Sequence, residues 1–320
     1  RHYSQVTHDY ETTELLAGTI PEDEPHGAQV MARYRWFREE YEKVTRSWQD
    51  FGNPYRTQWF GMSVLRRATE LEKRSELLDS LDDVIANTAT FLSLSPGWDR
   101  VWSNEQGPVL EDLQSLRRLC HQVDSSDAAE NGSIAERAKQ ERDWVRSRKR
   151  RLDDMTAGLE DGSLQPSAAL DELDEIASET KTKASRLARE AIDADTSSYA
   201  DERRRRYDDS VSSTDAAYAG YWYLGGGHGS YNPHSTIRLN PSSPAISAIG
   251  SSGSSSSGVG AGGSFSSFTP VSDLVVGYSS ASSYTPSSSS GSGSSFSGSS
   301  FSGGYSGGGG FSGSGSSSSF

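Results

Sequence analysis

The sequence predicts an all-α protein, an antiparallel bundle of about five long helices followed by a disordered Ser/Gly-rich tail. Apolar residues recur at spacings of three and four through most of the first 210 residues, and no segment there alternates convincingly with a period of two. After Arg238 the chain carries one formally charged side chain, Asp273. We therefore divide the chain into a polar acidic linker (1–27), a helical bundle (28–210), an aromatic and glycine-rich connector (211–249) and a low-complexity tail (250–320).

The first 27 residues are mostly polar. They contain an acidic cluster at 22–24 and two prolines, Pro21 and Pro25. We expect a linker here, with at most a short helix around Thr13–Ala17.

The first two long helices are expected on either side of Asn53-Pro54, a pair that suits an N-cap followed by the first position of a helix. The second of them should end at about Leu92. The first should begin at about Ala28, because seven large apolar residues then fall on one stripe: Val30, Tyr34, Phe37, Tyr41, Val44, Trp48 and Phe51.

Three more helices follow. A short turn is expected at Trp98–Asn104, and Pro108 should open the third helix. Ser133, with Glu136 three residues later, has the form of a capping box and should start the fourth. The fifth should run from about Ser167 to Asp209, and its second half is expected to protrude or fray because it has few large apolar residues.

Two packings of these helices compete, an intramolecular bundle of hairpins and a self-associating coiled coil. Short breaks marked by Pro and Gly favour the hairpins. Large aromatic residues at the seam suit globular packing better than a two-stranded zipper. We prefer the bundle, with weak dimerisation allowed, and we expect its core to bury Val30, Phe37, Val44, Leu71, Ile85, Leu113, Leu116 and Leu152.

The tail is rich in Ser and Gly, with single aromatic residues at intervals. Such a composition lacks the aliphatic side chains that offset the entropy of ordering a backbone. We expect residues 250–320 to be disordered, with the aromatic residues acting as weak, interchangeable contacts.

The charge of the chain excludes some partners. The formal net charge is −13, and all but Asp273 of this excess lies in residues 1–238. A region this acidic repels nucleic acid and anionic lipid as a whole. Two basic runs are the exception, at 146–151 and at 203–206, and we expect them to pair with nearby acids such as Asp153, Asp154, Asp201, Glu202, Asp208 and Asp209.

No catalytic, cofactor-binding or metal-binding residues are predicted. The six histidines are scattered, and the glycine run 225–229 is not followed by a helix signal, as a phosphate loop requires. Cys120 is the lone cysteine and lies at helical spacing among leucines, so we expect a small buried apolar residue. The sequence therefore predicts a protein that is not an enzyme and has no cofactor.

A contact surface is the remaining candidate site. The two basic runs could touch phosphate groups, and two tryptophans lie beside the main apolar stripes rather than on them. The candidate residues are Arg146, Arg148, Lys149, Arg150, Arg151, Arg203, Arg204, Arg205, Arg206, Trp36 and Trp144.

The segment Tyr199–Tyr231, with its four consecutive arginines and the run Gly-Gly-Gly-His-Gly, followed by the Ser/Gly/Phe tail, resembles an uncharacterised actinobacterial family of membrane-anchored proteins, domain of unknown function 5129. In that family a TPM-type domain and a transmembrane helix often precede the helical region. The resemblance implies no activity and no site residues. It implies a membrane anchor upstream of Arg1.

Together these observations predict a non-catalytic helical interaction or scaffolding region of a membrane-anchored bacterial protein. The alternatives are contact with anionic lipid or nucleic acid through the arginine-rich segments, and an accessory domain of an uncharacterised enzyme. We expect a protein partner or self-association, no nucleic acid, and attachment to the cell membrane through the upstream anchor. This segment should be cytoplasmic; the cell surface and a soluble protein are the alternatives.

Overall fold

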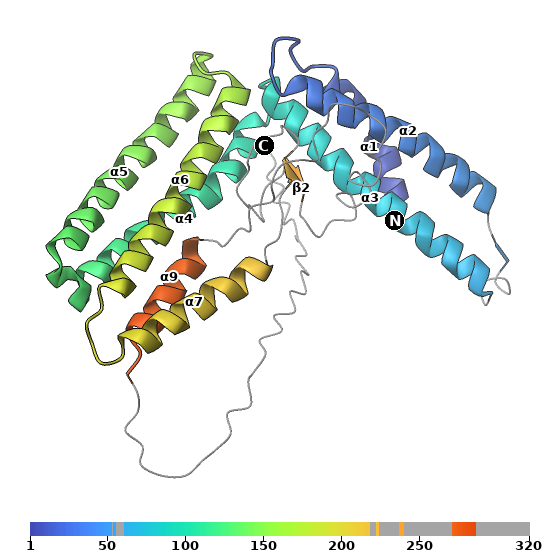
Figure 1. Ribbon diagram of the computed structural model, residues 1–320. Helices are drawn as coiled ribbons and strands as arrows, with labels where there is room; N and C mark the ends of the chain where they lie inside the picture. Colours follow the sequence, from blue (N-terminus) through green and yellow to red (C-terminus); the bar gives the residue numbers. More distant parts are fainter. Residues whose placement is uncertain (53, 56–60, 218–221, 224–236, 240–270, 286–320) are drawn as a thin grey trace, which may run out of the picture. The chain divides into compact units, whose positions relative to one another are not determined.

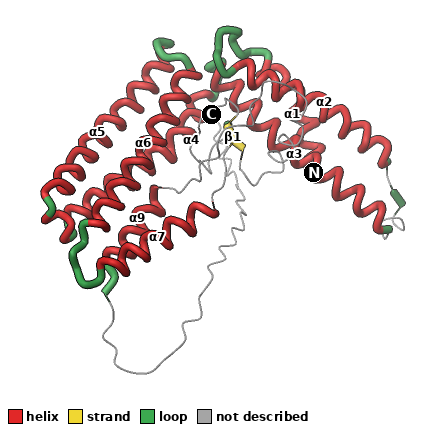
Figure 2. The backbone as a smooth tube through the Cα atoms, viewed as in Figure 1, coloured by secondary structure: helices red, strands yellow, loops and turns green. Residues whose placement is uncertain are grey.

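The computed structural model describes residues 1–52, 54–55, 61–217, 222–223, 237–239 and 271–285. Residues Arg1–Tyr284 form one compact unit (Figure 1), and Thr285–Phe320 form a second that lies almost wholly outside the described residues. The described part is helical apart from loops and one pair of two-residue strands (Figure 2). Five helices of 25 to 31 residues dominate it, which confirms the predicted all-α bundle.

The first three helices pack on one another. They are α1 (His2–Ala17), α2 (Gly27–Phe51) and α3 (Met62–Leu92). The predicted stripe of α2 faces inward, and Tyr10 of α1 stacks on Tyr41 with ring centroids 4.4 Å apart. The prediction of a linker with at most a short helix over residues 1–27 is therefore wrong. Val6, Thr13 and Ala17 are buried, so a mostly polar segment becomes helical through contact with α2 and α3.

The next three helices form the second part of the bundle: α4 (Trp98–Asp124), α5 (Gly132–Asp161) and α6 (Pro166–Asp193). Helix α4 is continuous through Pro108, so the predictions of a separate Trp98–Asn104 turn and of a helix starting at Pro108 are wrong. Trp102 explains the continuity, because its side chain is 1% exposed and its indole N–H donates to Thr156 Oγ1 at 2.9 Å. That packing offsets the backbone hydrogen bond that a proline removes.

Three helix boundaries also differ from prediction. Helix α3 begins at Met62 with Gly61 as its N-cap residue, so the prediction that Asn53-Pro54 opens this helix is wrong. Asn131, rather than Ser133, caps α5, since its side chain accepts a hydrogen bond from the Ser133 N–H. The predicted fifth helix is two helices, α6 and α7 (Ala200–Ala217), and α7 does not fray over the part that holds Tyr207. The Tyr207 ring is 1% exposed, because α6 and a later helix cover it.

That later helix, α9 (Val271–Ser282), lies in the predicted disordered tail. It packs against α4, α6 and α7, so the prediction of disorder is wrong for these twelve residues. The rest of 250–320, apart from Ser283–Thr285, lies outside the described residues. Within the predicted connector, β1 (Trp222–Tyr223) pairs antiparallel with β2 (Arg238–Leu239).

Polar contacts join the loop before α2 to the start of α6. The Ser167 hydroxyl donates to the Glu24 carboxylate and accepts the His26 N–H at 3.3 Å. His26 Nε2 and Asp171 Oδ1 are 3.0 Å apart. All eight residues predicted for the core are buried, none more than 3% exposed, so the packing of both sets of helices agrees with the sequence pattern.

Candidate functional site: the α9 groove

The surface of α4, α6 and α7 that holds α9 is the candidate site, and we call it the α9 groove. Five apolar residues of α9 recur at spacings of three and four and face this groove with 6% exposure or less: Val271, Leu274, Val275, Tyr278 and Ala281. A twelve-residue helix is marginal in water by itself. The contact with three other helices therefore stabilises α9 where its Ser/Gly-rich surroundings would not.

Polar groups of the bundle hold both ends of α9. At the start, the Val271 N–H donates to Asp112 Oδ1 of α4 at 3.3 Å, which satisfies one of the donors that a helix N-terminus leaves open. After the end, Arg203 donates to the Tyr284 carbonyl oxygen from Nε at 3.2 Å and from Nη2 at 3.1 Å. The Arg206 guanidinium lies 3.8 Å from the centroid of the Tyr284 ring.

A glycine allows α7 and α9 to approach closely. A Cβ atom added at Gly277 would lie 2.7 Å from Ser210 Oγ and 3.3 Å from Ser210 Cβ. Real Cβ atoms essentially never approach another heavy atom to the first of these distances. The groove is thus matched to a helix with a small residue at this position.

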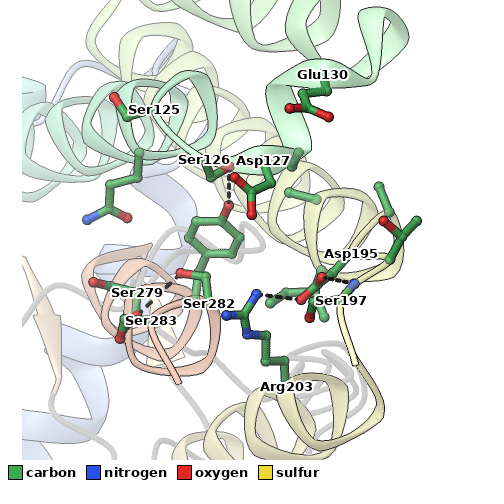
Figure 3. Close-up of a pocket in the computed structure, with 17 residues that line it drawn as sticks. Ser125, Ser126, Asp127, Glu130, Asp195, Ser197, Arg203, Ser279, Ser282 and Ser283 are labelled. Atoms are coloured by element: carbon green, nitrogen blue, oxygen red, sulfur yellow. Dashed lines mark hydrogen bonds and ion pairs between the residues drawn. The ribbon is translucent and has the colours of Figure 1, made fainter. Parts of the chain in front are cut away.

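A cavity of about 740 Å³ lies beside α9 (Figure 3). Hydroxyl groups and the carboxylates of Asp127 and Glu130 line its wall, and Tyr278 Oη lies 3.4 Å from Ser126 Oγ. Arg203 Nη1 donates to Asp195 Oδ2 at 2.7 Å, and the Ser197 N–H donates to Asp195 Oδ1 at 2.8 Å. Burial raises the pKa of Asp195, but these hydrogen bonds outweigh it and leave the pKa below its usual range. Arg203 and Asp195 are thus engaged with each other and, through Arg203, with Tyr284, and the cavity offers hydroxyl groups and the carboxylates of Asp127 and Glu130.

The first basic run lies on α5, where most of its cations are paired. Arg146 pairs with Asp143, Arg151 Nε lies 2.6 Å from Glu172 Oε1, and Arg148 Nη2 lies 3.5 Å from Glu179 Oε2. The acids are thus other than the predicted Asp153 and Asp154. Lys149 and Arg150 are exposed, and no ion pair within the described residues involves them.

The second basic run lies on α7, and the pairing predicted for it is largely confirmed. Arg204 pairs with Asp193 and Asp201, Arg205 with Glu202 and Asp209, and Arg206 with Glu202. Asp208 instead pairs with Arg189. What sequence reasoning missed is that Arg203 and Arg206 also contact Tyr284, the second residue after α9. The signal for that partner was the cluster of aliphatic residues at 271–276 within the Ser/Gly-rich tail.

The two tryptophans are half-buried rather than free. Trp36 packs against the core. The Trp144 ring has the Arg148 guanidinium at 5.3 Å and the Lys183 ammonium at 4.9 Å from its centroid. Most of the predicted contact residues therefore stabilise the bundle from its surface.

Cys120 is buried, as predicted, and burial raises the pKa of its thiol to about 12. In the part of the chain that the structure describes, no group of three His, Cys, Asp or Glu side chains is placed to hold a metal ion. None of the described helices combines the length and the apolar composition that a bilayer span requires.

Comparison with known proteins gives one match. A family model described as a domain of unknown function (DUF5129) matches residues 1–173, which run from α1 into the first turns of α6. No curated protein and no solved structure matches the chain. The matched part lacks α7 and α9.

Proposed function

The chain belongs to the DUF5129 family, whose description names no activity, and we propose that it is a non-catalytic helical interaction and scaffolding region whose α9 groove binds an amphipathic helix. The observation that carries this proposal is the seating of α9 in the groove. Helix-in-groove recognition uses apolar anchors at helical spacing, which α9 supplies through Leu274, Val275 and Tyr278.

The arrangement supports scaffolding because it attaches the tail at a defined place. Asp112 and Arg203 hold the two ends of α9, and the tail continues after Tyr284. The bundle supplies a rigid support, and the docking of α9 in the groove fixes the point on the bundle at which the tail begins.

Of the two alternatives, lipid or nucleic-acid contact through the arginine-rich segments has less support. The guanidinium groups of those segments are mostly engaged by carboxylates, which lowers their net attraction for a phosphate. We also propose, from the resemblance described above, that a membrane anchor precedes this region and places it on the cytoplasmic side.

A peptide experiment tests the groove. In the full chain, Leu274→Asp with Tyr278→Asp should release α9 and leave the groove open. A fluorescently labelled peptide of residues 268–286 should then bind this variant and raise the fluorescence anisotropy, but should not bind the wild-type chain, where α9 occupies the groove. The matched control is the same peptide carrying Leu274→Asp. Binding of neither peptide to the variant, or equal binding of both, would contradict a helix-binding groove.

A further inference from the structure

The first turns of α3 lack the cover that the rest of the helix has. No side chain from Met62 to Glu70 is buried, and Leu71 is the first that is. The reason lies in α1, whose first residues meet α3 only later: the Arg1 amino group lies 3.8 Å from Glu72 Oε1, and His2 Nδ1 lies 2.7 Å from Asp79 Oδ2. The start of α3 therefore extends past α1 (Figure 1).

Large apolar side chains stand on this uncovered part. Met62 is 75% exposed and Leu65 42% exposed, and Tyr55, in the loop before α3, is 79% exposed. They make up half of the large apolar side chains that are exposed among the described residues. Met62 and Leu65 share one face of α3 with Arg66, because residues three and four apart lie next to one another on a helix. These three side chains border a hollow of about 400 Å³.

The charge here is opposite to that of the whole chain. From Phe51 to Thr69 the sequence has three arginines and no acid, whereas the chain carries a net charge of −13. No ion pair within the described residues involves Arg66 or Arg67, and the Arg67 guanidinium lies 5.8 Å from the centroid of the Phe51 ring. The hollow is also bordered by Glu70 and Lys73, whose opposite charges cancel on that side.

We propose that the uncovered start of α3, which we call the α3 tip, is a contact site for an anionic membrane surface. Met62, Leu65 and Arg66 share its exposed face, and Arg67 lies on the side of the helix that meets Phe51. Two exposed apolar side chains beside the Arg66 guanidinium, with a second arginine on the same turn of the helix, match the boundary between headgroups and acyl chains. A second copy of the chain fits less well, because a two-fold contact sets the same patch against itself and would bring the arginines of both copies together. The acidic charge of residues 1–238 as a whole repels anionic lipid, so among the described helices we expect the membrane to meet the α3 tip first.

Vesicle binding by the full chain tests the proposal. We expect sedimentation with vesicles of phosphatidylcholine and phosphatidylglycerol, loss of that binding at high salt, and little binding to phosphatidylcholine alone. Replacing Arg66 and Arg67 by Glu should weaken binding at least about fivefold for each arginine. The matched control, Arg146→Glu with Arg150→Glu, makes the same charge change on α5 and should bind like the wild type.

A dye reports which part of the chain meets the lipid. Because Cys120 is buried, a cysteine introduced by Met62→Cys can be labelled selectively with an environment-sensitive fluorophore. Anionic vesicles should shift its emission to the blue, and should not shift that of a dye at Glu39→Cys on α2. Equal binding to neutral vesicles, equal loss in the α5 control, or no binding would overturn the proposal. So would a dimer that Met62→Ser with Leu65→Ser abolishes while vesicles fail to bind.

Discussion

Two short helical segments with apolar side chains meet opposite surroundings in this protein. In helix α9, Leu274 and Tyr278 are only 2% exposed, although the sequence around this helix is mostly Ser and Gly. The first turns of α3 begin a 31-residue helix, yet they leave Met62 and Leu65 in solvent. The comparison shows that burial here depends on whether another helix reaches the segment. The length and the helix propensity of the segment itself do not determine its burial.

The largest effect is expected in the core around α4, because this helix packs against both α3 and α9. Leu113 and Leu116 of α4 are fully buried. Replacing both by Asp places two unpaired charges in the core, which should destabilise the fold by more than about 5 kcal/mol and so unfold it. Circular dichroism should show lost helix content. Cooperative melting with unchanged helix content would contradict the assignment of α4 to the core.

A more local effect is expected at the contact of α7 with α9. Gly277→Leu forces a side chain against Ser210, and overpacking of this kind costs about 1–3 kcal/mol. Hydrogen exchange at residues 271–282 should accelerate while the core amides of α4 stay protected. The matched control is Val276→Leu, because Val276 is 67% exposed and a larger side chain there meets solvent. Equal acceleration in both variants would mean that close packing at Gly277 does not hold α9.

The docking of α9 should also depend on pH, through Asp112. The pKa of its carboxyl group is raised to about 7, chiefly by burial and also by Glu111 and Asp273, while the Val271 N–H and Lys181 act in the opposite direction. A carboxyl group with a raised pKa in the docked state binds a proton that the solvated group releases. Its contribution is therefore complete below about pH 4 and is lost as the pH rises through about 7.

Hydrogen exchange of α9, corrected for intrinsic rates, should show weaker protection at pH 8 than at pH 5. The slope should be at most about 1.4 kcal/mol per pH unit, and smaller because Asp112 is half-buried. Asp112→Asn keeps an acceptor for the Val271 N–H and should abolish the slope at α9. Asp82 of α3, whose pKa burial also raises to about 7, should still contribute to the pH dependence of global melting. An unchanged slope in Asp112→Asn would assign it to another group.

The smallest effect is expected at the first turns of α3, the second segment of the comparison. Met62→Ser with Leu65→Ser removes side chains that solvent already surrounds, so the free energy of unfolding should change by less than about 0.5 kcal/mol. Leu71→Ser, on the same helix but 3% exposed, should cost several times more. Urea melts of the two variants make the measurement. A large loss in the Met62/Leu65 variant would show that another part of the chain covers the α3 tip.

The sequence predicted those parts of the fold where the apolar pattern alone determines the outcome. The stripe Val30, Phe37 and Val44 identified α2 and its buried face, and Leu113 and Leu116 did so for α4. Helix α1 was missed because it buries few side chains and owes its helicity to neighbours that a local pattern does not contain. The helix start predicted at Pro108 was wrong for a similar reason. Proline is common at the first position of a helix, but here the packing of Trp102 stabilises a helix that continues on both sides of Pro108.

The site was harder to predict than the fold. The arginines at 203–206 stood out as a charge feature, but their role depends on a residue about 80 positions away, Tyr284. Helix α9 was missed because the prediction of disorder used the average composition of the tail, in which residues 271–282 are outnumbered by Ser and Gly. The local signal was present in the spacing of Val271, Leu274, Val275 and Tyr278, which matches one face of a helix.

The 53 residues between α7 and α9, 218–270, make α9 a tethered ligand for its own groove. Because both belong to one chain, the effective concentration of α9 at the groove does not depend on the concentration of the protein. A competing helix from another protein must therefore exceed that effective concentration or bind more tightly than α9 does. The covalent link thus sets a threshold for any partner that would displace α9.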